Sequence, residues 1–177
     1  NYVFQGGGNV PTATVAAGRL GLRAAILGVA GNDLFGRANA ADFAYNHVDV
    51  SHLKLREERR TNFCVCVSER SINGKEFISC PGDFEPLAPQ ELDADFIRSA
   101  KILHIGDMLT PAKFAAAELI HGAGGVVSID AAYYRPDIYE NYRYLDIFIA
   151  SETYLNAMRA DKGNLSCEEA CRYIRAQ

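Results

Sequence analysis

Short, nearly continuous apolar runs alternate with alanine-rich segments along this chain. The apolar runs are bounded by glycine or polar residues and predict buried strands over 23–29, 101–106, 125–130 and 145–150. Apolar residues at helical spacing predict helices over 11–20, from 34 to just before 47, over 90–100, 111–122 and 151–158, and from Ser166 onward. Such alternation indicates an α/β fold in which helices cover a mostly parallel sheet.

One stretch interrupts this alternation. Residues 61–67 and 75–80 are strand-like, and the segment between them ends in Asn73-Gly74. Asn-Gly between two apolar runs is a strong signal for a tight antiparallel turn. The sequence therefore predicts a β-hairpin over 61–80, set within the α/β series.

Composition and charge limit the classes of function. The 177 residues are 49% hydrophobic and 23% charged, as in one globular domain, and the net charge is −4. Because lysine and arginine form no cluster, no binding to nucleic acid is expected. Neither a signal peptide nor an apolar run of about 20 residues, the length that spans a bilayer, is found. We therefore expect no membrane association and a cytoplasmic location.

Five cysteines in a chain without a secretory signal indicate reduced thiols. Cys64 and Cys66 would share one strand face, and a buried face is favoured over a metal half-site because no second half-site follows. Cys167 and Cys171 have i, i+4 spacing, for which helix packing is favoured. The histidines form no His-Glu-x-x-His pattern, and we expect no zinc site.

Three glycines, Gly6 to Gly8, stand directly before the first predicted helix. A phosphate-binding P-loop is excluded because no Lys-Ser or Lys-Thr pair follows, and the dinucleotide fingerprint lacks its third glycine. Glycines let backbone N–H groups approach a ligand, and Asn9 and Thr12 are placed to hydrogen-bond hydroxyl groups. This chemistry fits a polyol ligand; a glycine turn without a ligand is the alternative.

Further along the chain, Asp33 precedes the second predicted helix. Its carboxylate can cap that helix or contact a ligand, and capping is favoured because aspartate is a common N-cap residue.

The order of these features resembles one known family. Gly7-Gly8 precede an alanine-rich helix, Gly-Asn-Asp-Leu-Phe-Gly follows at 31–36, and the hairpin comes next. Matching segments continue at 102–106, 127–130 and 146–152. The chain thus resembles the PfkB/ribokinase family of carbohydrate and nucleoside kinases over nearly its whole length. The resemblance implies a ribokinase-like, mostly parallel, doubly wound sheet over 1–177, with the hairpin as a lid that closes over substrate.

The resemblance also implies roles for single residues. Gly7 and Gly8 would lie against the sugar, and Asn9 is a neighbouring candidate by its chemistry. Thr12 stands where the family usually has an asparagine that holds sugar hydroxyls, so the identity of the sugar is open. Asp130 and Arg135 resemble the segment that lines the substrate cleft.

The family's Asn-x-x-Glu motif, which organises Mg²⁺ and phosphate, falls on 151–154, where both diagnostic residues are absent. Ser151 and Glu152 are the candidates for the ATP side, although Glu152 is equally explained as a first-turn glutamate favoured by the helix dipole. The family's Gly-Ala-Gly-Asp motif, with its general base, has no counterpart here. We therefore expect no catalytic residue and no metal ligand in this chain, a piece lacking its start and C-terminal portion, and no activity from it alone.

The resemblance favours an ATP- and Mg²⁺-dependent sugar kinase, and leaves two alternatives. A nucleoside kinase of the same fold would need room for a base over the sugar. A non-catalytic, sugar-binding protein would account for the changes at Thr12 and at 151–154. The family's lid often contributes to dimer contacts, so a homodimer through the hairpin is a further expectation.

Overall fold

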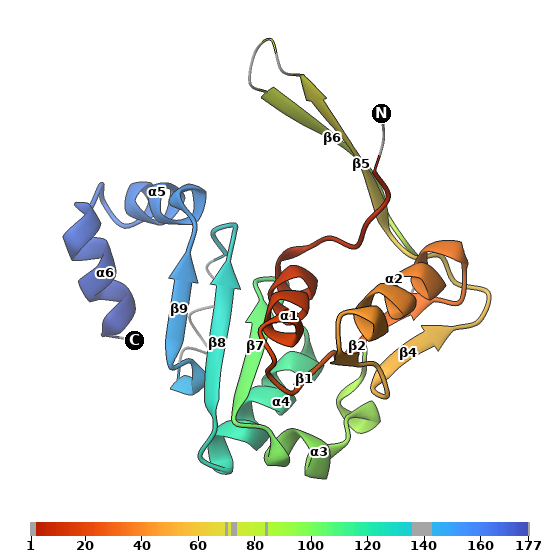
Figure 1. Ribbon diagram of the computed structural model, residues 1–177. Coiled ribbons are helices and arrows are strands. Elements are labelled where there is room, and N and C mark those ends of the chain that lie inside the picture. Colours follow the sequence, from red (N-terminus) through yellow and green to blue (C-terminus); the bar gives the residue numbers. More distant parts are fainter. Residues whose placement is uncertain (1–2, 70, 72–73, 84, 136–142, 177) are drawn as a thin grey trace. The chain divides into compact units, whose positions relative to one another are not determined.

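The computed structural model describes residues 3–69, 71, 74–83, 85–135 and 143–176 (Figure 1). The chain forms two units, Asn1–Leu87 and Ala88–Gln177. Each unit carries parallel strand pairs together with helices, which confirms the α/β prediction.

The first unit holds two helices and six strands among its described residues. In chain order these are α1 (Asn9–Arg19), β1 (Ala24–Ala25), β2 (Gly28–Gly31), α2 (Leu34–Tyr45), β3 (Val48–Asp49), β4 (Leu53–Arg56), β5 (Phe63–Glu69) and β6 (Gly74–Cys80). Strand β1 pairs with β3 and β2 pairs with β4, both in parallel. The buried side chains of Ile26, Phe43 and Val48 form its core, against which Val10 and Val15 of α1 pack.

The strand predicted over 23–29 is two short strands, β1 and β2, with Ile26 and Leu27 between them. The break has a local cause in the partner segment. Between β3 and β4 the chain turns, with Ser51 N–H donating to the Asp49 carboxylate at 2.8 Å and Leu53 N–H to the Val50 carbonyl at 3.0 Å. Because a turn removes residues from the ladder, the facing strand is interrupted at the same level.

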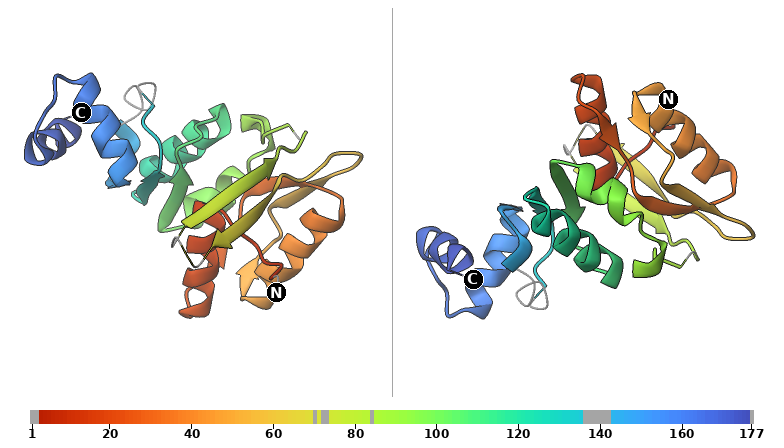
Figure 2. Two further views of the ribbon diagram at one scale, coloured as in Figure 1. Left: turned by 90° about the horizontal axis from the view of Figure 1, so that it is seen from above. Right: turned by 90° about the horizontal axis from the view of Figure 1, so that it is seen from below.

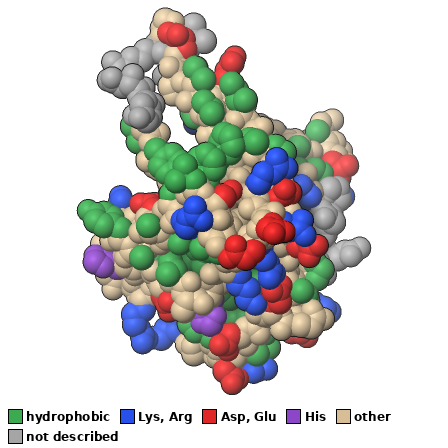
Figure 3. All heavy atoms as spheres, turned by 90° about the vertical axis from the view of Figure 1, so that its right-hand side faces the viewer, with side chains coloured by type: hydrophobic (Ala, Val, Ile, Leu, Met, Phe, Trp, Pro, Cys, Tyr) green, Lys and Arg blue, Asp and Glu red, His purple; other side chains and the backbone are tan. Residues whose placement is uncertain are grey.

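Strands β5 and β6 form the predicted hairpin, paired antiparallel from Phe63↔Cys80 to Glu69↔Gly74. Asn73, half of the predicted turn signal, lies outside the described residues. All of β5 is exposed, and Figure 3 shows hydrophobic side chains along the hairpin. The predicted burial of Cys64 and Cys66 is therefore wrong: both thiols are exposed, because no other element among the described residues of the unit covers their face.

The second unit is built on three parallel strands in the order β7-β8-β9. Its elements are a 3₁₀ turn η1 (Pro89–Glu91), α3 (Ala94–Ser99), β7 (Ile102–Gly106), α4 (Pro111–Gly122), β8 (Val126–Ala131), β9 (Ile147–Ala150), α5 (Glu152–Asp161) and α6 (Cys167–Arg175). Helix α4 packs on β7 and β8, a relation visible in Figure 2. The side chains of Val127 and Ile129 in the central strand are fully buried.

The helix ends of this unit follow the sequence signals. Helix α4 covers the predicted range, with Pro111 at its first position and Thr110 as a side-chain cap. Helix α6 begins at the predicted place, where Ser166 and Glu169 form a capping box. The predicted packing of Cys167 and Cys171 is wrong, because both lie on the exposed side of α6. Among the described residues, no helix is long and apolar enough to cross a bilayer.

Candidate functional site

The glycine loop leads into α1 with its backbone open to solvent. A Cβ added at Gly7 would meet nothing within 4 Å, and Gly8 has a φ of 100°, a conformation that glycine adopts without strain. Gly7, Gly8, Asn9 and Thr12 are all exposed. The loop therefore leaves space beside its main chain, where a ligand can approach N–H groups at the start of α1.

Three aromatic rings in contact join the segment before these glycines to the base of the hairpin. The ring of Phe4 lies 5.9 Å from that of Phe35 on α2, and Phe35 stacks on Phe63 of β5 at 4.6 Å. Stacked and tilted ring pairs at these distances are favourable contacts. The start of the hairpin is thus tied to both α2 and the N-terminal segment.

The Gly-Asn-Asp-Leu-Phe-Gly segment anchors the base of the hairpin. Asp33 caps α2 by accepting from Gly36 N–H at 2.8 Å, so the favoured capping role is confirmed. The same carboxylate accepts from the N–H and the hydroxyl of Thr61, both at 2.8 Å. A Cβ at Gly36 would lie 1.9 Å from the Gly31 carbonyl oxygen, which explains the glycine there.

Thr61 is a residue that sequence reasoning missed. Its side chain is buried, and its hydroxyl also accepts from Gly31 N–H at 2.9 Å. Burial raises the pKa of Asp33, but hydrogen bonds from Gly36 and Thr61 outweigh it and hold the pKa below its ordinary 3.8. A contact between residues 28 positions apart leaves no local sequence signal.

In the second unit, the candidate residues lie at or just after the carboxyl ends of β8 and β9. Asp130 is half-buried and pairs in register with Gly106 on β7 and Ile149 on β9. Arg135, four residues past β8, is exposed. In open parallel sheets, ligands bind at this edge.

Ser151 caps α5 and also ties down the segment after β8. Its hydroxyl donates to the Ala132 carbonyl at 2.7 Å and accepts from Tyr154 N–H at 2.9 Å. A serine oxygen has two lone pairs, so it can accept one more hydrogen bond. Direct use of its proton by a nucleotide would break the contact with Ala132.

Tyr154 stands where the resemblance places a glutamate, and its side chain belongs to the core. Its exposed fraction is 0%, and its ring contacts those of Phe148 at 5.2 Å and Tyr134 at 5.5 Å. Glu152 is exposed in the first turn of α5. Across the described ranges, no three His, Cys, Asp or Glu side chains gather as a metal site. These residues do not by themselves form a ligand set for Mg²⁺.

Lys113 is a second residue without a sequence signal. It lies in the first turn of α4, and its ammonium donates to the carbonyls of Gly106 at 3.3 Å and Met108 at 2.5 Å. Burial lowers the pKa of Lys113, and the nearby Asp107 carboxylate partly opposes this. The lysine therefore holds the loop after β7.

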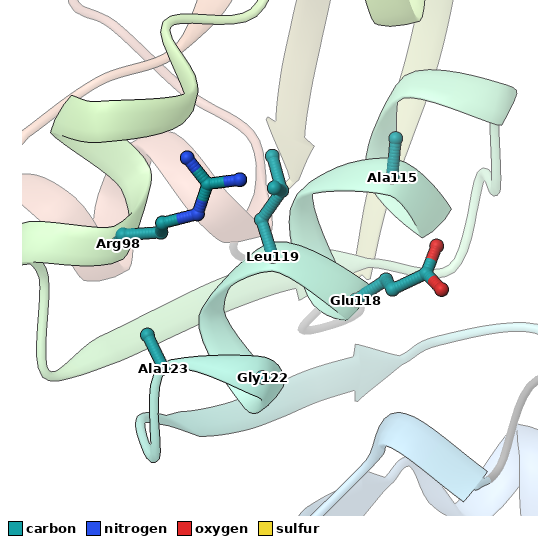
Figure 4. A pocket seen from close by; sticks show the side chains of 6 residues that line it. All are labelled: Arg98, Ala115, Glu118, Leu119, Gly122 and Ala123. Carbon is teal, nitrogen blue, oxygen red and sulfur yellow. The ribbon is translucent and has the colours of Figure 1, made fainter.

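A pocket of about 390 Å³ lies between α3 and α4 (Figure 4). Its lining residues are Arg98, Ala115, Glu118, Leu119, Gly122 and Ala123. None of the predicted site residues lines it. Of those residues, Gly7, Gly8, Asn9 and Thr12 belong to the first unit, and Asp130, Arg135, Ser151 and Glu152 to the second.

Comparisons with known proteins address the fold and the family. The sequence matches the family described as "pfkB family carbohydrate kinase" over residues 1–176. It is 34% identical over 132 residues to an Arabidopsis thaliana protein named "Probable fructokinase-3", covering 70% of this chain and 38% of that protein. It is 30% identical over 145 residues to a fructokinase of Salmonella typhimurium, covering 78% and 47% of the two chains. The chain thus spans less than half the length of these relatives.

A fructokinase of Xylella fastidiosa, solved with bound ATP, superposes with a TM-score of 0.81 at 17% identity, covering 96% of this chain and 59% of that one. This likeness confirms the ribokinase-like fold.

Proposed function

The chain belongs to the pfkB family of carbohydrate kinases, and on that premise we propose that the whole protein transfers the γ-phosphate of ATP to a sugar hydroxyl. The family match over residues 1–176 carries the proposal. ATP as donor is supported by the structural neighbour solved with ATP. Fructose is the first sugar to test, because the relatives are named fructokinases.

We assign the sugar to the glycine loop. The open space beside Gly7 and the conformation of Gly8 support this assignment. Asn9 and Thr12, exposed at the start of α1, supply an amide and a hydroxyl for sugar oxygens. The hairpin, anchored through Thr61, would act as the lid that excludes water during phosphoryl transfer.

Asp130 and Arg135 are proposed to contact the substrate from the second unit. Their positions support this role, because Asp130 lies at the carboxyl end of a parallel strand and Arg135 follows that strand. Asp130 can accept from sugar hydroxyls, and Arg135 can donate to sugar or phosphate oxygens. Ser151 and Glu152 are proposed for the nucleotide side, with Ser151 accepting through its remaining lone pair. No step through Mg²⁺ is assigned to these residues.

The general base is not assigned to any residue of this chain. We propose that it belongs to the part of the protein that corresponds to the remaining length of the relatives, as 38% coverage of one relative suggests. The chain by itself would then bind sugar without turnover.

The proposal also covers the oligomeric state and the cellular location of the protein. A homodimer through the hairpin is supported by exposed apolar side chains on it, among them Val65 and Ile78. A cytoplasmic location is supported by the five exposed, free cysteines, which suit a reducing compartment.

The test is ADP release by the complete gene product with fructose, other ketoses, aldoses, sugar acids and nucleosides. We expect turnover with a free sugar, and none from the 177-residue chain assayed in parallel. Turnover with adenosine or inosine alone would identify a nucleoside kinase of the same fold. If none of these compounds leads to ADP release, the proposal is contradicted.

A second candidate, a sugar-binding protein without kinase activity, is favoured by one observation. The buried ring of Tyr154 occupies the position of the family's carboxylate. Calorimetric binding of a sugar, without ADP release at any ATP concentration, would support this function.

A further inference from the structure

The segment after β8 is held at successive residues by different elements. The Ser151 hydroxyl, just past the end of β9, donates to the Ala132 carbonyl at 2.7 Å. The Tyr133 N–H donates at 2.8 Å to the carboxylate of Asp107, which lies just past the end of β7. Both neighbouring strands therefore fix the backbone of this segment at their carboxyl ends.

The next residue is fixed through its side chain. The Tyr134 hydroxyl donates to the Asp161 carboxylate at 2.7 Å, at the far end of α5. The Tyr134 ring also contacts the buried ring of Tyr154. Three consecutive residues thus have partners on three different elements. Fixing a residue's backbone costs conformational entropy, so such contacts keep a loop ordered only when several act together.

Asp107 is itself held in place. Lys113 donates to the carbonyls of Gly106 and Met108, the residues on either side of Asp107. These bonds fix the backbone of the loop that presents the carboxylate to Tyr133.

Arg135 follows this fixed segment directly and is exposed. We infer that Asp107 is a positioning residue, which orders the segment from Ala132 to Tyr134 and so places Arg135 against the substrate. The inference rests on the proposed function, in which Arg135 contacts the substrate. An arginine on an ordered backbone loses less conformational freedom on binding, so its hydrogen bonds contribute more to affinity.

The test uses steady-state kinetics of the complete gene product with Asp107→Ala, Arg135→Ala and the double variant. Asp107→Ala should raise KM for the sugar about tenfold, with kcat changed less than about threefold. Asp107→Asn should restore KM, because the amide oxygen accepts the same hydrogen bond. In the double variant, Asp107→Ala should add nothing to the effect of Arg135→Ala. Asp95→Ala, an exposed site on α3, is the matched control.

Amide hydrogen exchange gives a readout that needs no activity. The peptide covering 132–135 should exchange faster in Asp107→Ala, and at the original rate in Asp107→Asn. The positioning role would be overturned if Asp107→Ala left the exchange rate of this peptide unchanged. It would also be overturned if the effects of Asp107→Ala and Arg135→Ala on KM multiplied in the double variant. If Arg135→Ala leaves KM unchanged while exchange responds as expected, the segment is ordered by Asp107 but Arg135 is not a substrate contact. That result would reject the placement of Arg135 in both the inference and the proposed function.

Discussion

Asp33 binds Thr61 twice, through the backbone N–H and through the side-chain hydroxyl, each at 2.8 Å. The same carboxylate caps α2. One side chain therefore fixes both the start of a helix and the base of the hairpin. Because Thr61 is buried, loss of the carboxylate would remove the acceptor of its backbone N–H, while its hydroxyl would keep the contact with Gly31.

We expect Asp33→Ala to lower the free energy of unfolding by about 2 kcal/mol, because it removes a helix cap and two further hydrogen bonds. Urea denaturation followed by circular dichroism measures this change. Asp95→Ala, which removes an exposed carboxylate from the first turn of α3, serves as the control and should change stability little. Equal effects of the two substitutions would contradict the anchoring role.

The lowered pKa of Asp33 makes stability depend on pH. A carboxylate whose pKa is lower in the folded state stabilises the fold above its ordinary pKa of 3.8, and this stabilisation is lost as pH falls through the folded value. Asparagine also caps helices but does not titrate here. The stability difference between wild type and Asp33→Asn should therefore stay constant above about pH 5 and shrink as the pH falls from there to below 3.8. A difference that stays constant over this range would contradict the prediction.

Gly7→Ala tests the sugar side of the proposed site. The added methyl group meets no protein atom within 4 Å, so stability should change by less than about 0.5 kcal/mol. If a sugar lies against Gly7, the same methyl group should raise its KM about tenfold or more. Gly122→Ala, at the end of α4, also meets open space and should leave KM unchanged. A sugar KM unaffected by Gly7→Ala would remove the glycine loop from the site.

The hairpin should mediate self-association through one particular face. Val65 pairs with Ile78, and Val67 and Phe63 point to the same side because side chains alternate along a strand. Cys64, Cys66 and Phe77 lie on the opposite face. Ile78→Lys should weaken the dimer by at least about tenfold, as measured by sedimentation velocity. Phe77→Lys, at a position of similar exposure, should have a smaller effect; equal effects would argue against this interface.

Local signals in the sequence located most elements. Proline at the first position and a threonine cap defined α4, and the capping box defined α6. Burial in the hairpin was not predictable in the same way. The continuous apolar run over 63–67 indicates a covered strand, but both faces are open among the described residues of the unit, so Cys64 and Cys66 are exposed. Periodicity describes the strand and not what packs on it.

The candidate site shows the same limit. The glycine loop and the Asp33 cap could be inferred from residue types, because both depend on neighbours in sequence. The contact of Asp33 with Thr61 and the contact of Asp107 with Tyr133 join residues 28 and 26 positions apart. Such pairs arise only when the tertiary fold brings their elements together. The sequence likewise shows that Tyr154 is a different residue type from the one in the family pattern, but only the structure shows that its side chain is buried.

Within the described residues, β5 and β6 pair only with each other. Each strand therefore keeps an outer edge of backbone groups that can add another strand. Lys75 is one positive charge along this apolar ribbon, and such charges oppose uncontrolled stacking. These open edges are sites where further chains can add, so the hairpin links the assembly of this protein to its tendency to aggregate.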